Sequence, residues 1–182
     1  MLRYPSLLIL AAVFALQGCA TTLTKGSDRR TEGVYIEDSS IEEMAVDRIK
    51  KKYGAKVQVN VNSYNRKVLV TGEVADDTVK SDITRITGTV QNVTGIFNEL
   101  TIGAQSNFSA RSNDALITSN VKLRLRNSAK EFFKADRVTV ITEKNSVYLM
   151  GLVTRAEADV AIEVARTSSG VSKVVPFFEF ID

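Results

Sequence analysis

Ser146-Val147-Tyr148-Leu149-Met150-Gly151-Leu152-Val153 is the stretch that decides the fold, because a related stretch occurs 79 residues earlier. The earlier stretch reads Lys67-Val68-Leu69-Val70-Thr71-Gly72-Glu73-Val74. Both contain the β-branched and apolar residues typical of a strand, and both have glycine at the sixth position. We infer that one structural unit occurs twice in this chain.

The correspondence continues on both sides of these strands. Apolar residues with helical spacing precede each copy at an offset of 76, and valines with strand spacing lie between at an offset of 79. The matched positions are Ile41, Ala45 and Ile49 with Ile117, Val121 and Leu125, and Val59 and Val61 with Val138 and Val140. Downstream, Val93 and Ile96 match Val171 and Val174 at an offset of 78.

Each copy therefore predicts a helix, two strands, a second helix and a third strand. The first copy should end in one strand from residue 93 to residue 102, and Thr154 with Glu157 predicts a capping box at the start of the last helix. The expected fold class is α+β, with two tandem αββαβ domains, each a three-stranded mixed sheet with two helices packed on one face. The expected ranges are 39–103 for the first domain, 104–111 for a linker and 112–182 for the second domain.

The amino-terminal residues predict export. Arg3 precedes an apolar run from Leu7 to Leu16, which is too short to span a bilayer and is typical of a secretory signal. The run ends in Leu16-Gln17-Gly18-Cys19, which resembles the lipobox of bacterial lipoproteins. An ordinary cleaved signal with Cys19 as a small apolar residue is the alternative.

The lipobox resemblance implies a signal peptide over residues 1–18 and acylation of Cys19, which becomes the first mature residue. It implies three acyl chains, palmitate among them, and several chains anchor a protein firmly. Ala20 and Thr21 follow the cysteine where an aspartate would imply retention in the inner membrane, so the expected location is the outer membrane, facing the periplasm. Residues 19–38 are polar and lack periodicity, and we expect them to form a flexible tether.

Composition limits the chemistry. The 182 residues are 44% hydrophobic and 25% charged, with a net charge of +3, which is typical of a globular protein. The single cysteine allows no internal disulfide, and the absence of histidine removes the commonest base and metal ligand. Asp76 and Asp77 stand where a helix cap is expected. We therefore expect no enzymatic activity, no cofactor and no metal.

The doubled unit, a glycine closing each second strand (Gly72, Gly151) and a valine-rich final strand together resemble the BON domain. Two such copies behind a lipobox are similar to the dual BON-domain outer-membrane lipoproteins. This resemblance implies binding of anionic phospholipid, such as phosphatidylglycerol or cardiolipin, mainly by the second copy. It also implies a role in cell-envelope integrity and no enzymatic activity.

The two copies differ on the outer side of their first helices. Leu116 and Leu123 lie off the core stripe of Ile117, Val121 and Leu125, whereas the aligned residues of the first copy are Ser40 and Asp47. Residues 111–137 contain seven basic and three acidic residues, a net charge of +4, whereas residues 37–56 contain five of each. Cations beside apolar side chains suit an interface with anionic lipid.

The candidate phospholipid-binding residues share this helix and the basic loop after it. They are Leu116, Asn120, Lys122, Leu123, Arg124, Arg126, Lys130, Phe132, Phe133 and Lys134. Three alternatives remain open. Leu116 packs against the first domain, the two phenylalanines cover the core, or the cations form an ordinary solvated face.

The middle strand of the second copy is apolar on both faces, because Tyr148, Met150 and Leu152 point away from the core valines and leucine. We expect these residues to pack against the first domain or against a partner. The second functional hypothesis uses this face in a protein adaptor for outer-membrane assembly or cell-wall remodelling machinery. Nucleic acid is not an expected partner, because the export signal argues against it.

Overall fold

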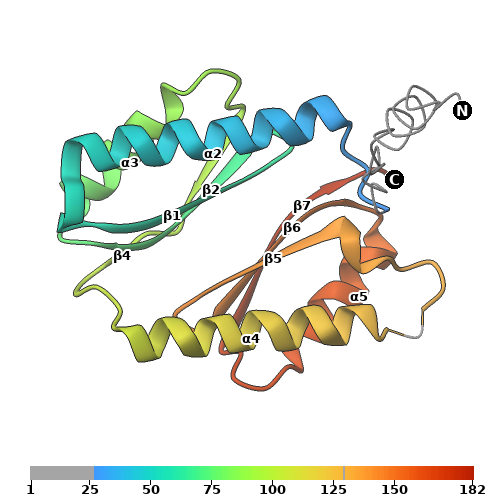
Figure 1. Cartoon of the computed structure of the whole chain (residues 1–182). Helices are drawn as coiled ribbons and strands as arrows, with labels where there is room; N and C mark the ends of the chain where they lie inside the picture. The colour runs from blue at the N-terminus through green and yellow to red at the C-terminus, as the bar shows by residue number, and fades with distance from the viewer. Residues whose placement is uncertain (1–26, 129) are drawn as a thin grey trace, which may run out of the picture.

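The computed structural model describes residues 27–128 and 130–182, which form two α+β units in tandem (Figure 1). The lipobox, Cys19 and the signal peptide lie outside the described residues. The elements of the first unit are α2 (Glu32–Tyr53), η2 (Gly54–Lys56), β1 (Gln58–Tyr64), β2 (Lys67–Val74), α3 (Asp77–Gly88), β3 (Gly95–Asn98) and β4 (Thr101–Ile102). Those of the second are α4 (Phe108–Arg126), η3 (Ala135–Arg137), β5 (Val138–Glu143), β6 (Ser146–Val153), α5 (Arg155–Arg166) and β7 (Lys173–Phe180).

Both sheets are mixed, and the predicted α+β fold is confirmed. In the second unit the strand order is β5-β6-β7, with β5 antiparallel and β7 parallel to β6. The first unit has the order β1-β2-β3, and the short β4 also pairs with β2. The single strand predicted over 93–102 is wrong, because Leu100 turns into the core and its backbone N–H bonds to the Asn98 side chain.

The two hairpins explain how each first helix is fixed to its sheet. Asn65 and Arg66 in the first unit, and Lys144 and Asn145 in the second, have positive φ values between 47° and 65°, as two-residue hairpin turns require. The buried Asp114 of α4 accepts hydrogen bonds from the backbone N–H groups of both Lys144 and Asn145, each at 2.9 Å. Each unit has this arrangement, because Asp38 binds the first turn in the same way.

Three apolar clusters hold the molecule together. One lies between the helices and sheet of each unit, built around Ile41, Val68 and Ile83 in the first and Ile117, Leu149 and Ala161 in the second. The third lies between the two sheets, which cover each other's helix-free faces (Figure 1). The layer order is therefore helices, sheet, sheet, helices.

The ordered part of the chain begins earlier than the sequence predicted. A tether was expected through residue 38, but α2 begins at Glu32 with Thr31 as its N-cap. Before it, Arg29 and Arg30 form ion pairs with Glu157 of the second unit and Asp38 of the first. The tether prediction failed because these contacts are made across the fold and leave no local periodicity in the sequence.

The connection between the units is also shorter than expected. The linker was predicted over 104–111, whereas α4 begins at Phe108, with the Asn107 side chain accepting a hydrogen bond from the N–H of Ala110. The N-cap and the first helical turn therefore occupy the second half of the predicted linker. Within residues 27–128 and 130–182, no helix combines the length and hydropathy needed to span a membrane.

Candidate functional site

Helix α4 exposes an apolar stripe on the side opposite its core contacts. Leu116 and Leu123 are 68% and 56% exposed, while Ile117, Val121 and Leu125 are buried. At roughly 100° per residue, Leu116 and Leu123 point within about 20° of one another, with the exposed Asn120 between them. Leu116 therefore does not pack against the first domain.

The corresponding positions of α2 are polar and exposed. Ser40 stands in place of Leu116, and Asp47 stands in place of Leu123 and forms an ion pair with Lys51 at 2.7 Å. The two helices share a buried face, because both cores use the same positions. The difference between the copies is thus confined to the outer surface, where burial imposes no choice of residue.

Arg124 has a structural partner that the sequence did not reveal. Its guanidinium donates to the carbonyl of Val164 at 3.0 Å and to the hydroxyls of Ser168 at 2.7 Å and Thr167 at 3.0 Å. Arg48, its counterpart in α2, donates to the hydroxyl of Thr89 at 2.7 Å. Both arginines therefore brace the first helix against the end of the second, and Arg124 is less free for a ligand than Lys122 or Arg126.

Lys122 and Arg126 are exposed cations on the opposite flank of the stripe from Arg124. With about 100° per residue, the two side chains point within roughly 40° of each other. Neither forms an ion pair among the contacts of the described residues. This flank combines free positive charge with a neighbouring apolar stripe.

The loop after α4 separates the two predicted phenylalanines. Phe132 is 50% exposed, whereas Phe133 is buried in the core of the second unit. Phe133 is therefore corrected from a candidate ligand contact to a core residue. The loop has no helical or strand periodicity, so the sequence could not determine which aromatic ring turned inward.

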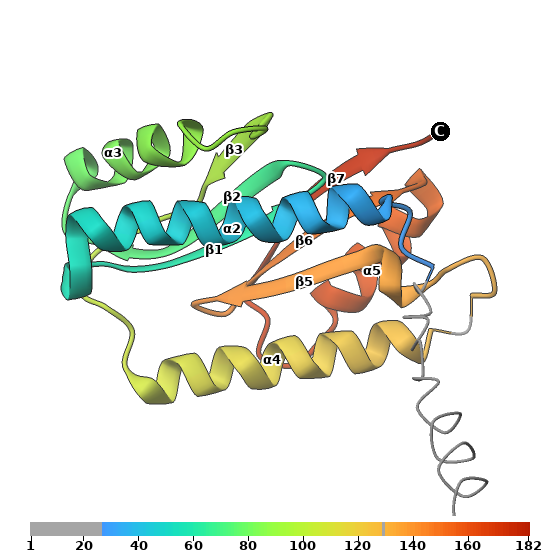
Figure 2. The ribbon, with the colours of Figure 1, turned by 45° about the horizontal axis from the view of Figure 1, so that its top comes forward.

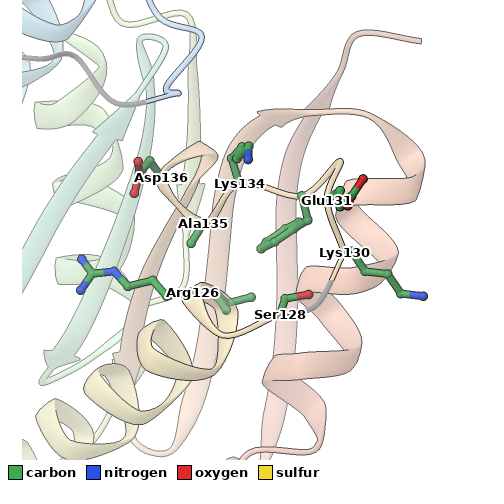
Figure 3. A pocket seen from close by; sticks show the side chains of 9 residues that line it. Arg126, Ser128, Lys130, Glu131, Lys134, Ala135 and Asp136 are labelled. Atoms are coloured by element: carbon green, nitrogen blue, oxygen red, sulfur yellow. The ribbon is translucent and has the colours of Figure 1, made fainter.

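A shallow pocket of about 370 Å³ lies where this loop meets the end of α4. Its cations are Arg126, Lys130 and Lys134, and its carboxylates are Glu131 and Asp136. Figure 3 shows Lys130 and Arg126 pointing to opposite sides of the pocket. The pocket can therefore offer positive groups to an anion from more than one direction, with a small excess of positive charge.

The three residues predicted for packing lie on the sheet face between the units. Tyr148 and Met150 are 5% and 1% exposed, and Leu152 packs at the edge of the same cluster. Tyr64 and Leu69 come from the first unit, and Phe97 stacks on Phe177 with 4.1 Å between ring centroids. Burial raises the pKa of Tyr148 to about 12, with further effects from Glu99 and Glu143.

A buried carboxylate near one end of the molecule was not singled out beyond its capping role. Glu157 forms the predicted capping box with Thr154, and it also bonds to Arg29 at 2.6 Å and to Arg137. Burial opposes its charge, but the bonds from Arg29, from the Thr154 N–H and from Arg137 prevail and lower its pKa to about 2. The spacing of Thr154 and Glu157 revealed the cap, but no sequence signal revealed the arginines.

No cluster of three or more potential metal-ligating side chains occurs among residues 27–128 and 130–182. The assembled groups are cations, apolar side chains and helix-bracing bonds. Such a surface is suited to noncovalent contact with an anionic, partly apolar partner.

Comparison with known proteins places these features in context. The family model described as BON domain matches residues 37–104 and 113–181. The chain is 33% identical to the outer membrane lipoprotein DolP of Haemophilus influenzae over 185 aligned residues, covering 96% of this chain and 95% of the relative. It is 32% identical to a 21 kDa hemolysin of Actinobacillus pleuropneumoniae, covering 87% and 81%.

Solved structures offer a more distant comparison. CdsD, a structural protein of the type III secretion system of Chlamydia trachomatis, shares 12% identity with a TM-score of 0.29, covering 79% of this chain and 90% of CdsD. Its C-terminal domain shares 11% identity with a TM-score of 0.32, covering 84% and 100%.

Proposed function

From the premise that this chain belongs to the BON domain family, we propose that it is an outer-membrane lipoprotein that binds anionic phospholipid through its second domain. It is anchored through Cys19 and faces the periplasm. The ligands are lipids such as phosphatidylglycerol or cardiolipin, and their binding supports the integrity of the cell envelope. The DolP relative supports the location, and the surface of α4 supports the ligand class.

The observation that carries this proposal is the difference between two otherwise matched helices. Leu116 and Leu123 are exposed on α4, whereas the first domain has Ser40 and Asp47 at the same places. Exposed leucines gain about 0.8 kcal/mol for each methylene that enters an apolar layer. Each neighbouring lysine or arginine adds about 1 kcal/mol at an anionic surface.

Vesicle flotation tests the proposal with a chain that begins at residue 20, so that no acyl anchor contributes. We expect binding to phosphatidylglycerol vesicles and little binding to phosphatidylcholine vesicles. L116S/L123D gives α4 the residues of α2, and K122E/R126E reverses its free charges. Each double variant should weaken phosphatidylglycerol binding by about tenfold or more, since two cations contribute about 2 kcal/mol.

The first domain provides a matched control for the charge reversal. K50E changes the residue of α2 that corresponds to Arg126 and should leave vesicle binding within about twofold of the unaltered chain. Circular dichroism checks that each variant is folded. Binding that survives both α4 double variants, or that falls equally with K50E, would reject the second domain as the lipid site.

The adaptor hypothesis relied on the apolar sheet face of the second domain. Tyr148 and Met150 on that face pack against the first domain. An adaptor for outer-membrane assembly or cell-wall remodelling machinery would therefore need a different surface.

A further inference from the structure

Residues 27–30 fix the point at which the anchor segment leaves the folded chain. Arg29 donates to the carbonyl of Leu152 at 2.9 Å and to Glu157 at 2.6 Å, both in the second domain. Arg30 donates to Asp38 of the first domain at 2.9 Å. Because both domains hold this segment, the exit point cannot swing relative to either one.

The same end of the molecule gathers several chain segments. In both Figure 1 and Figure 2 the start of α2, the carboxyl end of β7 and the loop after α4 lie together there. Arg137 connects two of the segments, donating to the carbonyls of Ser27 and of Phe132, each at 3.3 Å. We call this end the tether end.

Exposed apolar side chains from three segments lie at the tether end. Tyr35 and Ile36 near the start of α2 are 55% and 59% exposed, and Phe132 is 50% exposed. Phe180 and Ile181 at the end of the chain are 47% and 48% exposed. These five are half of the ten large exposed apolar residues in the described part of the chain, so the tether end is enriched in them.

Contacts connect these side chains to the exit point. The guanidinium of Arg30 lies 5.1 Å from the ring centre of Tyr35, and that of Arg155 lies 4.7 Å from the ring centre of Phe180. The Ile181 N–H donates to the carbonyl of Val153 at 3.2 Å, one residue beyond the carbonyl that Arg29 binds. The apolar residues therefore surround the exit of the anchor segment.

The length of the anchor segment limits its reach. Eight residue steps separate Cys19 from Ser27, and a fully extended chain spans at most about 28 Å over that number. This is close to the length of α4, whose 19 residues extend about 28 Å at 1.5 Å each. The tether end must therefore stay nearer to an anchored Cys19 than the far end of the molecule.

We propose that the tether end is a second membrane-contacting surface, which inserts Tyr35, Ile36, Phe132, Phe180 and Ile181 into the bilayer that holds the anchor. Both domains contribute to it. It rests on the proposed acylation of Cys19 and not on the lipid selectivity of α4. Its arginines Arg29, Arg30 and Arg137 are paired with Glu157, Asp28 and Asp38, so docking depends on apolar contact more than on lipid charge.

The acylated full chain allows a direct test, because Cys19 is its only cysteine and is consumed by the anchor. A cysteine introduced by Ile36→Cys or Ile181→Cys then takes a single fluorophore. Ile102→Cys is the matched control, since Ile102 is 51% exposed and lies on β4, at the opposite end of the first domain (Figure 1). The probe is a vesicle of phosphatidylcholine, with and without phosphatidylglycerol, carrying a small fraction of nitroxide-labelled lipid.

We expect the labels at 36 and 181 to be quenched at least threefold more than the label at 102 in both kinds of vesicle. Equal quenching at all three positions, or none, would overturn the proposal. The same labels in the L116S/L123D background separate it from the proposed function. Retained quenching there supports the tether end even if the α4 site fails, and quenching that is lost with the α4 stripe overturns an independent second surface.

Discussion

Glu157 keeps its negative charge in a buried position because three donors surround it. Its side chain is 2% exposed, and Arg29, Arg137 and the Thr154 N–H all bond to it. The group belongs to the second domain, whereas Arg29 lies in the segment that leads to the anchor. This one carboxylate therefore connects the cap of α5, the loop before β5 and the start of the described chain.

The pH dependence of stability should report this carboxylate. Its pKa is lowered to about 2, below the value near 4.5 expected in the unfolded chain, so the unfolded state binds the proton more readily. Its contribution is fully present above about pH 4.5 and is lost as the pH falls toward 2. Urea unfolding at pH 7 and pH 3 measures the loss.

Glu157→Gln is the variant that isolates this effect. It should be less stable than the unaltered chain at pH 7, because two arginines lose a charged partner. Its further loss between pH 7 and pH 3 should be smaller. An equal acid-induced loss in both proteins would assign the acid sensitivity to other groups.

Single side chains show where sequence reasoning succeeds and fails. The helical spacing of Ile117, Val121 and Leu125 is sufficient to place Leu116 on the outer side of its helix. Phe133 could not be placed in the core, because its loop has no periodicity to read. Arg124 was read as a free cation because its partner Val164 lies 40 residues away. Local pattern predicts which face is buried, but not which long polar side chain is already occupied.

Among the strands, the glycines of β2 and β6 do more than the predicted closing of a strand. Both strands continue beyond the glycine, to Val74 and Val153. A Cβ on Gly72 would lie 2.0 Å from the carbonyl oxygen of Gln58, and one on Gly151 would lie 2.5 Å from that of Arg137. The glycine therefore permits the neighbouring strand to approach closely at the same place in each sheet.

Gly72→Ala should be strongly destabilising. The added methyl meets backbone of β1, which cannot rotate away, and the φ of 121° is unfavourable for any residue with a Cβ. We expect a loss of about 2 kcal/mol or more in the free energy of unfolding, measured in urea.

Gly88→Ala provides the matched substitution. A Cβ there would have an ordinary 3.5 Å contact with Ile96, and alanine favours the helix in which it lies. This variant should be neutral or slightly more stable. Equal destabilisation by both substitutions would show that crowding against β1 is not what Gly72 avoids.

The two domains together behave as one packed body, because each sheet covers the other. Met150 is 1% exposed in the cluster that also contains Tyr64 and Leu69 of the first domain. Each domain has its own core as well. The sheet interface can therefore be weakened without removing either core.

Met150→Glu tests this separation. A buried charge without a partner costs several kcal/mol, and opening the interface would give the carboxylate access to water. We expect a larger radius of gyration by X-ray scattering and two unfolding transitions in place of one, with the circular dichroism largely kept. Leu116→Glu, on the exposed side of α4, should change neither. An unchanged radius with a single transition would contradict the interface as the element that joins the domains.

The shared layer between the sheets also sets an order of events in biosynthesis. Phe177, which stacks on Phe97, is the sixth residue from the carboxyl end of the chain. A polypeptide delivered amino end first would hold Tyr64, Leu69 and Phe97 uncovered until nearly its last residue had arrived. The nascent protein is most vulnerable to sticking to its neighbours during that interval, and truncation by even ten residues would make the vulnerability permanent.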